Sequence, residues 1–309
     1  MGLIEQAANR LEQLRRAGVE VPELPPAPAA DKPPVDSGAA AAKPASPSPA
    51  VESRTKRVSL NLEALGAAGF ISPQMPRSQI ADEYRVIKRP LIDNAMGKGA
   101  APIANGNLIM VTSAVPGEGK TFTAINLAMS IAMELDTTVM LVDADVANPS
   151  VLRVLGLPAG PGLLDALAKD SLDLADVLLR TDVEKLTILP AGNKHPRATE
   201  LLASDAMTRL LEDMAKRYDD RVIIFDSPPL LVTTEARELA SHMGQIVMVT
   251  RAEHTLHGQV KQALATIENC PVKMMVLNQT SPDPMGSYGY GYGYGYGYGY
   301  GHGQDKKAS

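Results

Sequence analysis

The residues best suited to chemistry form a glycine-rich loop at 114–121, with the sequence AVPGEGKT. A loop of this kind after a strand and before a helix turns backbone N–H groups toward phosphate oxygens, and the helix N-terminus adds its dipole. Lys120 would bring a positive charge to the β- and γ-phosphates, and the Thr121 hydroxyl can bind Mg²⁺. The pattern has one departure, Ala114 in place of its first glycine. We therefore predict a site for ATP and Mg²⁺. The nucleotide-binding residues would be Pro116, Gly117, Glu118, Gly119, Lys120, Thr121 and Phe122.

Three aspartates end apolar runs further along the chain. Asp143 and Asp145 close the run VMLVDAD, and Asp226 closes VIIFD. An acid at the end of a buried strand can bind Mg²⁺ directly or through water, and strand alternation points Asp143 and Asp145 to the same side. A lone aspartate there is usually a turn or cap residue, but three beside a phosphate loop predict a catalytic group. Its members would be Lys120, Asp143, Asp145 and Asp226, with Thr121, Asp143 and Asp226 as metal ligands.

Seven tyrosines alternate with glycine between residues 288 and 300, and the chain has only two others, Tyr84 and Tyr218. Glycine at every second position disfavours regular structure, and this run has no apolar neighbours to form a core. Phenol hydroxyls displayed beside a nucleotide site suggest a kinase that carries its own substrate. The alternative is a self-associating low-complexity tail without phosphoryl chemistry. The predicted acceptors are Tyr288, Tyr290, Tyr292, Tyr294, Tyr296, Tyr298 and Tyr300.

These groups require a scaffold, and apolar strands alternate with helices in the middle of the chain. This alternation predicts an α/β fold of the P-loop NTPase kind, with a mostly parallel sheet covered by helices on both faces. Ligands in such sheets bind at the carboxyl ends of the strands, where each motif above falls. The expected strands are 108–112, 138–142, 186–190, 221–225, 245–249 and 272–277. The expected helices are 78–96 with an interruption near Pro90, 119–134, 163–167, 172–178, 200–218, 234–242 and 258–269.

Composition divides the chain into four parts. We expect an amphipathic helix at 1–18, a disordered Pro/Ala-rich linker at 19–57, the P-loop domain at 58–280 and a flexible Gly/Tyr-rich tail at 281–309. The N-terminal helix would either pack on its own domain or bind a partner protein. The net charge of −5 does not indicate a protein that binds nucleic acid. A single cysteine, no signal peptide and no membrane-spanning apolar run predict a cytoplasmic protein, which reaches the inner membrane through a partner.

The motifs PGEGKT, LVDAD and IIFDSPP resemble those of the bacterial tyrosine kinases of exopolysaccharide synthesis. These are P-loop proteins of the MinD/ParA-like class, and the resemblance covers roughly residues 78–300. The segments LEQLRRAG and DEYRVIKRP look most like the exosortase-associated (PEP-CTERM) tyrosine autokinases. Such kinases accompany a separate membrane chain-length determinant protein, a polysaccharide co-polymerase. The resemblance implies phosphate and Mg²⁺ contacts for Lys120 and Thr121, and catalytic roles for the three aspartates, one of them near the tyrosine hydroxyl.

The resemblance also implies a homo-oligomer. Asp82, Arg85 and Lys88 resemble the acid-x-x-Arg-x-x-Arg element through which family members pack into a ring, although Lys88 lacks the bidentate geometry of arginine. A glycine-rich coil of about 16 residues has an r.m.s. span of roughly 20–24 Å, which suits the site of a neighbouring subunit and does not exclude the chain's own.

The resulting hypothesis is an ATP-dependent tyrosine autokinase that phosphorylates its tail and regulates exopolysaccharide chain synthesis and export. A protein-tyrosine phosphatase would oppose it. One alternative is a ParA/MinD-type regulatory ATPase, but that class carries a second lysine early in its loop, and this chain has Val115 and Pro116 there. The other alternative is a non-catalytic ATP-binding scaffold, against which the intact catalytic group argues.

Overall fold

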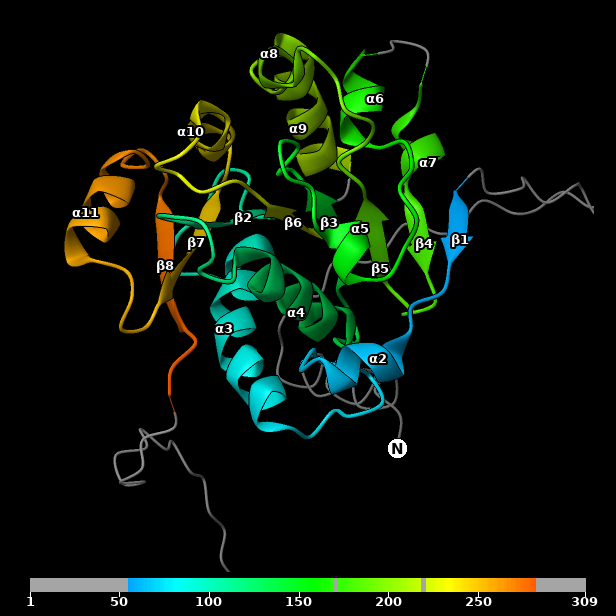
Figure 1. Ribbon diagram of the computed structural model, residues 1–309, viewed down its shortest axis with the longest axis vertical. Coiled ribbons are helices and arrows are strands. Elements are labelled where there is room, and N and C mark those ends of the chain that lie inside the picture. Colours follow the sequence, from blue (N-terminus) through cyan, green and yellow to red (C-terminus); the bar gives the residue numbers. More distant parts are fainter. Residues whose placement is uncertain (1–54, 169–171, 218–220, 282–309) are drawn as a thin grey trace, which may run out of the picture. The chain divides into compact units, whose positions relative to one another are not determined.

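An eight-stranded sheet organises the computed structural model, which describes residues 55–168, 172–217 and 221–281 (Figure 1). The strand order is β1-β4-β5-β3-β6-β2-β7-β8, and every neighbouring pair is parallel except β4 and β5. The strands are β1 (Lys56–Val58), β2 (Leu108–Ser113), β3 (Thr138–Asp143), β4 (Leu179–Thr181), β5 (Leu186–Leu189), β6 (Arg221–Asp226), β7 (Gln245–Arg251) and β8 (Val272–Asn278).

Helices cover both faces of this sheet (Figure 1). One face packs on α2 (Leu62–Ala67), α3 (Gln79–Ala95), α4 (Lys120–Ala132) and α5 (Val151–Val154), and these share one apolar core. The other face packs on α6 (Leu163–Ala168), α7 (Leu174–Val177), α8 (Ala198–Leu202), α9 (Asp205–Arg217), α10 (Thr234–Ser241) and α11 (His257–Ala265). The expected α/β fold is therefore confirmed.

The central strands are apolar because both of their faces are covered. Every residue of β2 is buried, and β3 and β6 are buried except at their first residues. Continuous Val, Ile, Leu and Met runs are typical of such strands. Helix α4 lies between the sheet and α3 and buries ten consecutive residues, 123–132. Since α4 begins at the glycine-rich loop, this packing fixes the direction in which the loop faces.

Helix α3 is continuous, so the expected interruption near Pro90 is wrong. Ser78 caps its start by accepting a hydrogen bond from the Ala81 N–H at 3.3 Å. Proline removes the bond that would reach the carbonyl of Val86. Pro90 and Val86 both lie on the exposed side, where water can replace that bond.

Several short elements were not expected from the sequence. They are β1, α2, α5 and β4, and the expected helix 200–218 is divided into α8 and α9. Strand β1 begins before residue 57, the expected end of the linker. The expected N-terminal helix and the tyrosine-rich tail lie outside the described residues.

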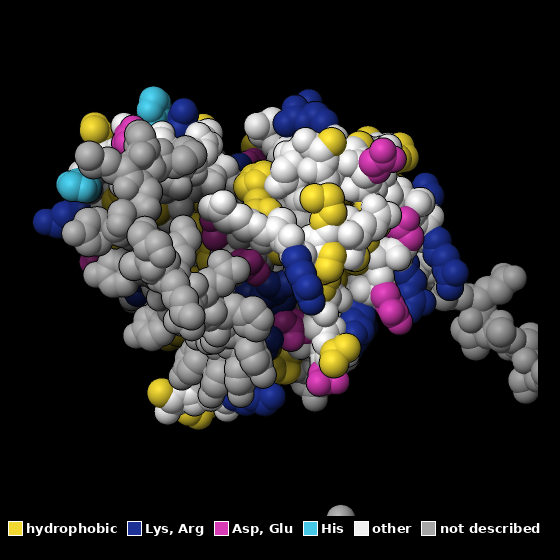
Figure 2. All heavy atoms as spheres, turned by 90° about the horizontal axis from the view of Figure 1, so that it is seen from below, with side chains coloured by type: hydrophobic (Ala, Val, Ile, Leu, Met, Phe, Trp, Pro, Cys, Tyr) yellow, Lys and Arg dark blue, Asp and Glu magenta, His cyan; other side chains and the backbone are white. Residues whose placement is uncertain are grey.

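Within the described ranges, no helix combines the length and the apolar character needed to cross a bilayer. Figure 2 shows one face of the molecule, and on it basic side chains are interspersed with acidic ones. Hydrophobic side chains on the same face are scattered in small groups.

Candidate functional site

The glycine-rich loop joins the end of β2 to the start of α4 in a conformation that depends on two glycines. Gly117 and Gly119 have φ angles of +83° and +94°, in the left-handed region that other residues rarely adopt. A Cβ atom added at Gly119 would lie 2.0 Å from Nδ2 of Asn278, so this position is closed sterically as well. The structure thus confirms the strand, loop and helix context that a phosphate-binding loop requires.

Glu118 is a structural part of the loop. Its side chain is almost fully buried, and its carboxylate accepts hydrogen bonds from the Val115 N–H at 2.7 Å and from the hydroxyl of Thr255. Its backbone carbonyl accepts a bond from Asn278 Nδ2 at 2.9 Å. Because Thr255 and Asn278 follow or end β7 and β8, the loop is tied to two neighbouring strands. The expected nucleotide contact of Glu118 can therefore come only from its backbone.

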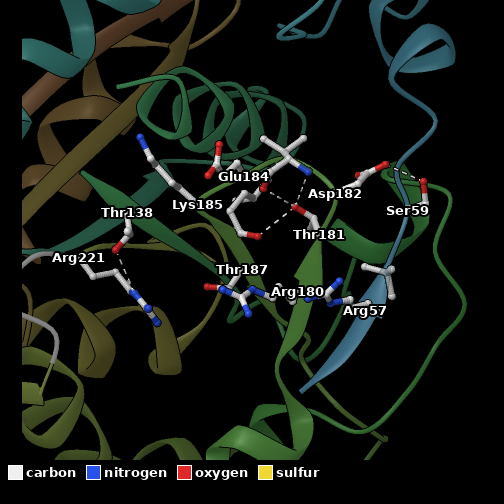
Figure 3. A pocket seen from close by; sticks show the side chains of 13 residues that line it. Arg57, Ser59, Thr138, Arg180, Thr181, Asp182, Glu184, Lys185, Thr187 and Arg221 are labelled. Carbon is white, nitrogen blue, oxygen red and sulfur yellow. Dashed lines mark hydrogen bonds between the residues drawn. The ribbon is translucent and has the colours of Figure 1, made fainter. Parts of the chain in front are cut away.

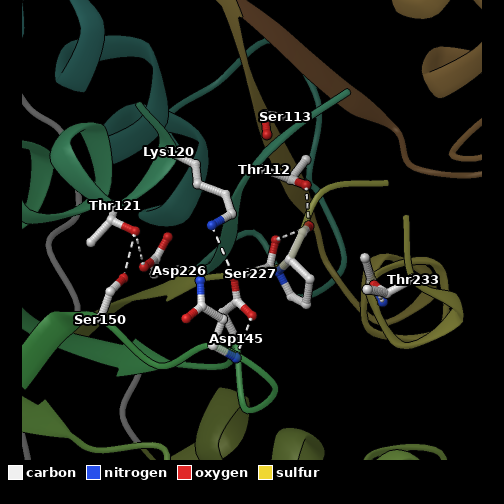
Figure 4. Close-up of polar contacts among 12 residues, drawn as sticks. Thr112, Ser113, Lys120, Thr121, Asp145, Ser150, Asp226, Ser227 and Thr233 are labelled. Atoms are coloured by element: carbon white, nitrogen blue, oxygen red, sulfur yellow. Dashed lines mark hydrogen bonds and ion pairs between the residues drawn. The ribbon is translucent and has the colours of Figure 1, made fainter. Parts of the chain in front are cut away.

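Lys120 meets the second of the expected acids. Its ammonium nitrogen lies 2.9 Å from Oδ2 of Asp145, and both side chains are largely buried (Figure 4). The other carboxylate oxygen of Asp145 accepts a bond from the Asn148 N–H at 3.2 Å. This ion pair keeps the Lys120 ammonium beside the loop. A phosphate bound there would compete with Asp145 for that ammonium group.

Thr121 meets the third acid. Its hydroxyl donates to Oδ2 of Asp226 at 2.7 Å and lies 3.0 Å from the hydroxyl of Ser150 (Figure 4). Asp226 ends β6, and the segment after it is fixed on β2 by a bond from the Ser227 N–H to the Val111 carbonyl at 3.1 Å. The loop threonine and this strand-end acid, both expected as metal ligands, therefore lie within hydrogen-bond distance of one another.

Asp143 lies beside Asp226, because the two residues are direct partners in the register of β3 and β6. Its Oδ2 atom accepts bonds from the N–H groups of Ser150 and Val151, both at 3.0 Å, at the start of α5. Its Oδ1 atom is buried and accepts no hydrogen bond from the described residues, and the same holds for Oδ1 of Asp226. Two buried carboxylate oxygens, unpartnered within the described ranges, therefore lie at the carboxyl ends of adjacent strands.

Burial shifts the titration of both acids. It raises the pKa of Asp226 to about 7, against the opposing effects of Lys120 and the Thr121 hydroxyl. Burial also raises the pKa of Asp143 to about 6, while the N–H groups at the start of α5 oppose the shift and the charge of Asp145 adds to it. A nearby cation would favour the ionised forms of both acids.

The residues present fit Mg²⁺ bound together with a nucleotide. Magnesium prefers oxygen ligands and usually takes one or two carboxylates, with phosphate and water oxygens completing the shell. Thr121, Asp143 and Asp226 offer such oxygens. In the part of the chain that is described, no three His, Cys, Asp or Glu side chains form a metal cluster by themselves, so the remaining ligands must come from outside the chain.

A cavity of about 390 Å³ opens beside Asp143. Its walls come from the segment before and within α5, the segment after it, and the end of β5. They are apolar apart from Asp143 and Arg153, and they include Pro149, Leu152, Leu157 and Ala191. The cavity has room for a planar aromatic ring next to the carboxylate.

Phe122 and Pro116 were expected to contact the nucleotide, and their side chains have different surroundings. The ring of Phe122 packs on Phe70, with centroids 4.9 Å apart, so only its backbone faces the loop region. Pro116 is exposed at the tip of the loop. Asn278, which ends the last strand, touches the loop directly, and its close approach to Gly119 was not foreseen.

Of the three residues expected at an oligomer interface, two are exposed. Asp82 and Arg85 form an ion pair on the surface of α3. Lys88 is buried, and its ammonium lies 2.7 Å from the Glu134 carboxylate and donates to the Ser130 carbonyl at 2.5 Å. Lys88 is therefore used within the chain, which corrects its expected role at an interface. The seven expected acceptor tyrosines lie outside the described residues.

Taken together, the site has a preformed phosphate loop, a largely buried lysine and two acids that can share a cation. This set neutralises and orients a polyphosphate, which is most of what phosphoryl transfer requires. An apolar cavity adjoins the Asp143 carboxylate.

Comparison with known proteins gives consistent matches to this architecture. A family model described as an AAA domain matches residues 106–278. The putative tyrosine-protein kinase EpsB of Ralstonia nicotianae is 34% identical over 182 residues, which make up 58% of this chain and 24% of EpsB. The tyrosine-protein kinase YwqD of Bacillus subtilis is 30% identical over 204 residues, 65% of this chain and 80% of YwqD.

A solved structure agrees with the sequence matches. The crystal structure of the chimerical protein CapA2B2 superposes with a TM-score of 0.59 at 27% identity, over 72% of this chain and 93% of that one. The chain spans only 24% of the length of each EpsB relative that it matches.

Proposed function

We propose, because this chain belongs to the AAA-domain family and within it to the bacterial tyrosine-protein kinases, that it is an ATP-dependent tyrosine autokinase. Its substrates would be the tyrosines between residues 288 and 300 of its own or a neighbouring chain. The observation that carries the proposal is the assembly of Lys120, Thr121, Asp143 and Asp226 around one phosphate loop.

In the proposed reaction, the phenol oxygen of a tyrosine attacks the γ-phosphorus of ATP. The bond from that phosphorus to the bridging oxygen breaks, and ADP leaves with the electron pair. Lys120 would move from Asp145 to the β- and γ-phosphates, while the loop N–H groups orient them. Mg²⁺, when held by Thr121 and Asp226 beside Asp143, would neutralise charge on the phosphates.

The phenol proton needs an acceptor, and we assign this role to Asp143. Its Oδ1 atom accepts no hydrogen bond from the described residues, and Asp143 is one of the residues that line the apolar cavity. A pKa of about 6 leaves it ionised near neutral pH while making it a better proton acceptor than an ordinary aspartate. The cavity would hold the tyrosine ring with its hydroxyl toward this carboxylate.

The cellular role is proposed by analogy with the family. The kinase would act at the inner membrane, together with a membrane chain-length determinant protein and as a homo-oligomer, to regulate exopolysaccharide synthesis and export. A protein-tyrosine phosphatase would remove the tail phosphates and complete a cycle.

The test is an intact-mass measurement of purified full-length protein incubated with Mg·ATP. A Lys120→Met variant removes the phosphate-binding charge, and a variant with all seven tail tyrosines changed to Phe removes the acceptors. We expect mass steps of single phosphates in the wild type and none in either variant.

Turnover of ATP without added mass, equal in the wild type and the Phe variant, would contradict the kinase proposal and favour an ATPase. If there is no turnover, the cytoplasmic segment of the membrane partner is added. Continued inactivity in its presence would also contradict the proposal.

A further inference from the structure

A row of arginine and threonine side chains crosses one corner of the sheet, at the end opposite the phosphate loop. Arg57 of β1 is the direct register partner of Arg180 of β4, and Arg180 is the partner of Thr187 of β5. Strand β3 continues the row at Thr138, two residues before the partner of Thr187, and Thr138 pairs with Arg221 of β6. Figure 3 shows Arg57, Arg180 and Thr187 next to one another.

Arg57 and Arg180 repel one another electrostatically when no anion is bound. Like charges directly opposite one another on neighbouring strands are destabilising. Neither Arg57 nor Arg180 has a hydrogen bond or ion pair to any side chain in the described ranges, and both are exposed. Such a pair becomes favourable when an anion binds between the two guanidinium groups, because each presents a planar fork of N–H donors.

The surroundings form a cleft for that anion. An open cavity of about 720 Å³ lies over this corner and is lined by Arg57, Arg180 and Arg221 together with the hydroxyls of Thr138 and Thr187. Arg221 donates from Nε to the Thr138 hydroxyl at 3.3 Å, which fixes the far end of the row.

One acid of the cleft is already hydrogen-bonded to other residues. Asp182 accepts bonds from the Ser59 hydroxyl at 2.6 Å and the Leu60 N–H at 3.0 Å. In Figure 3, Asp182 and Glu184 lie away from Arg57 and Arg180. The arginine side of the cleft is therefore positive although the whole chain has a net charge of −5.

We propose that this cleft binds phosphotyrosine from the tail of a second copy of the chain. The inference rests on the proposed function for the source of the phosphate, while the site itself rests on the register and the cleft. A phosphate monoester presents a compact dianion that matches two adjacent arginines, and the cleft has room for its aromatic ring. When one tail carries several phosphotyrosines, each of them could occupy this site.

Geometry favours the tail of another copy over the chain's own. The tail follows β8, and six strands lie between β8 and β1, a width of about 34 Å at about 4.8 Å per strand. A glycine-rich chain of about 19 residues, the separation of 281 from Tyr300, has an r.m.s. span of only roughly 24 Å. The site would thus join chains after phosphorylation, through a contact distinct from the catalytic cleft.

A membrane surface is a poorer match than a phosphopeptide. Anionic lipids attract clusters of several basic residues on an accessible surface. Here the arginines line a hollow that also contains Asp182 and Glu184. The hollow shape and the mixed charge both favour a discrete ligand.

The test measures binding of a synthetic tail peptide to full-length protein by fluorescence anisotropy. The protein carries Lys120→Met so that its own tail receives no phosphate. The probe is a labelled Gly-Tyr-Gly-Tyr-Gly peptide with one tyrosine phosphorylated, and the unphosphorylated peptide serves as its reference. We expect the phosphopeptide to bind at least tenfold more tightly, and Arg57→Gln with Arg180→Gln to weaken it by about tenfold or more.

A matched control is available on the same strand. Lys56 is also exposed but alternates to the other face of β1, so Lys56→Gln removes a neighbouring charge without touching the row. It should leave phosphopeptide binding within about twofold of its original value. Thermal unfolding of the double arginine variant at or above the original midpoint would show that it folds.

Other outcomes overturn the proposal. They are equal binding of the two peptides, undiminished binding in the double arginine variant, equal competition by inorganic phosphate alone, and arginine-dependent binding only to phosphatidylglycerol vesicles. None of these readouts depends on catalysis, because the peptide is phosphorylated synthetically. A failure here therefore leaves the kinase proposal standing, and a failure of the mass assay leaves the binding result interpretable.

Discussion

Replacing Asp226 with Asn should make the ligand-free protein more stable at alkaline pH while removing its activity. The side chain is fully buried, and burial raises its pKa to about 7 from the ordinary value of 3.8. In the folded state the acid therefore keeps a proton that the unfolded chain releases above about pH 4. The stability associated with that proton is complete below pH 3.8 and is lost as the pH rises through 7. Asparagine is neutral throughout and avoids this loss.

The magnitude follows from the shift. A difference of about 3 pKa units corresponds to about 4 kcal/mol in the free energy of unfolding above pH 7. Near pH 5 the same relation leaves a difference of about 1.5–2 kcal/mol, and near pH 3.5 almost none. For a domain of this size, 4 kcal/mol corresponds to a rise in Tm on the order of 10 °C.

The assay is thermal or urea unfolding of wild type and Asp226→Asn at pH 4, 5 and 8, without nucleotide or Mg²⁺. Asp93→Asn, which changes an exposed acid on α3, is the control and should shift stability by less than about 0.5 kcal/mol. Autophosphorylation by Asp226→Asn should fall at least about 100-fold, because a ligand of the Mg²⁺ ion is lost. Stability of the Asn variant equal to or below that of the wild type at pH 8 would refute the reasoning, since the buried charge would then be favourable.

Two further predictions concern the scaffold around the site. Gly119→Ala should weaken ATP binding and lower the free energy of unfolding by about 1–3 kcal/mol, because its φ of +94° and the close approach of Asn278 both exclude a Cβ; unchanged nucleotide affinity by calorimetry would contradict this. Lys88→Met should cost about 1–3 kcal/mol in urea unfolding, because Glu134 loses a buried partner. The exposed Arg89 pairs with the same carboxylate at 3.2 Å, and Arg89→Met should lower the free energy of unfolding by less than about 0.5 kcal/mol. Equal losses in the two variants would contradict the role of burial.

Much of this architecture could be predicted from the chain alone, because the relevant signals are local. Continuous apolar runs predict the six longer strands, and β3, β6 and β8 end at polar residues that the structure places at the site, Asp143, Asp226 and Asn278. Asp143, Asp145 and Asp226 were recognised because each follows such a run. Lys120 and Thr121 were recognised from the glycine pattern before them.

Other features depend on contacts between distant segments and leave little local trace. The burial of Lys88 depends on Glu134, 46 residues later in the sequence. The hydrogen bonds that Glu118 accepts from Thr255 and Asn278 join segments more than 130 residues apart. The three-residue strands β1 and β4 are too short for a periodic pattern, and they become strands only because they pair with one another and with β5.

Strands β1 and β4, at one edge of the sheet, are held by fewer residue pairs than the central strands. The central strands are long and buried, and their amides should exchange with solvent only on global unfolding. Strand β1 is held by three residue pairs to β4, and β4 by two pairs to β5. We therefore expect this edge to open before the central strands. Because β1 is the first described element of the chain, we expect a force or a ligand that acts on β1 to unfold this edge locally before it disturbs the central strands.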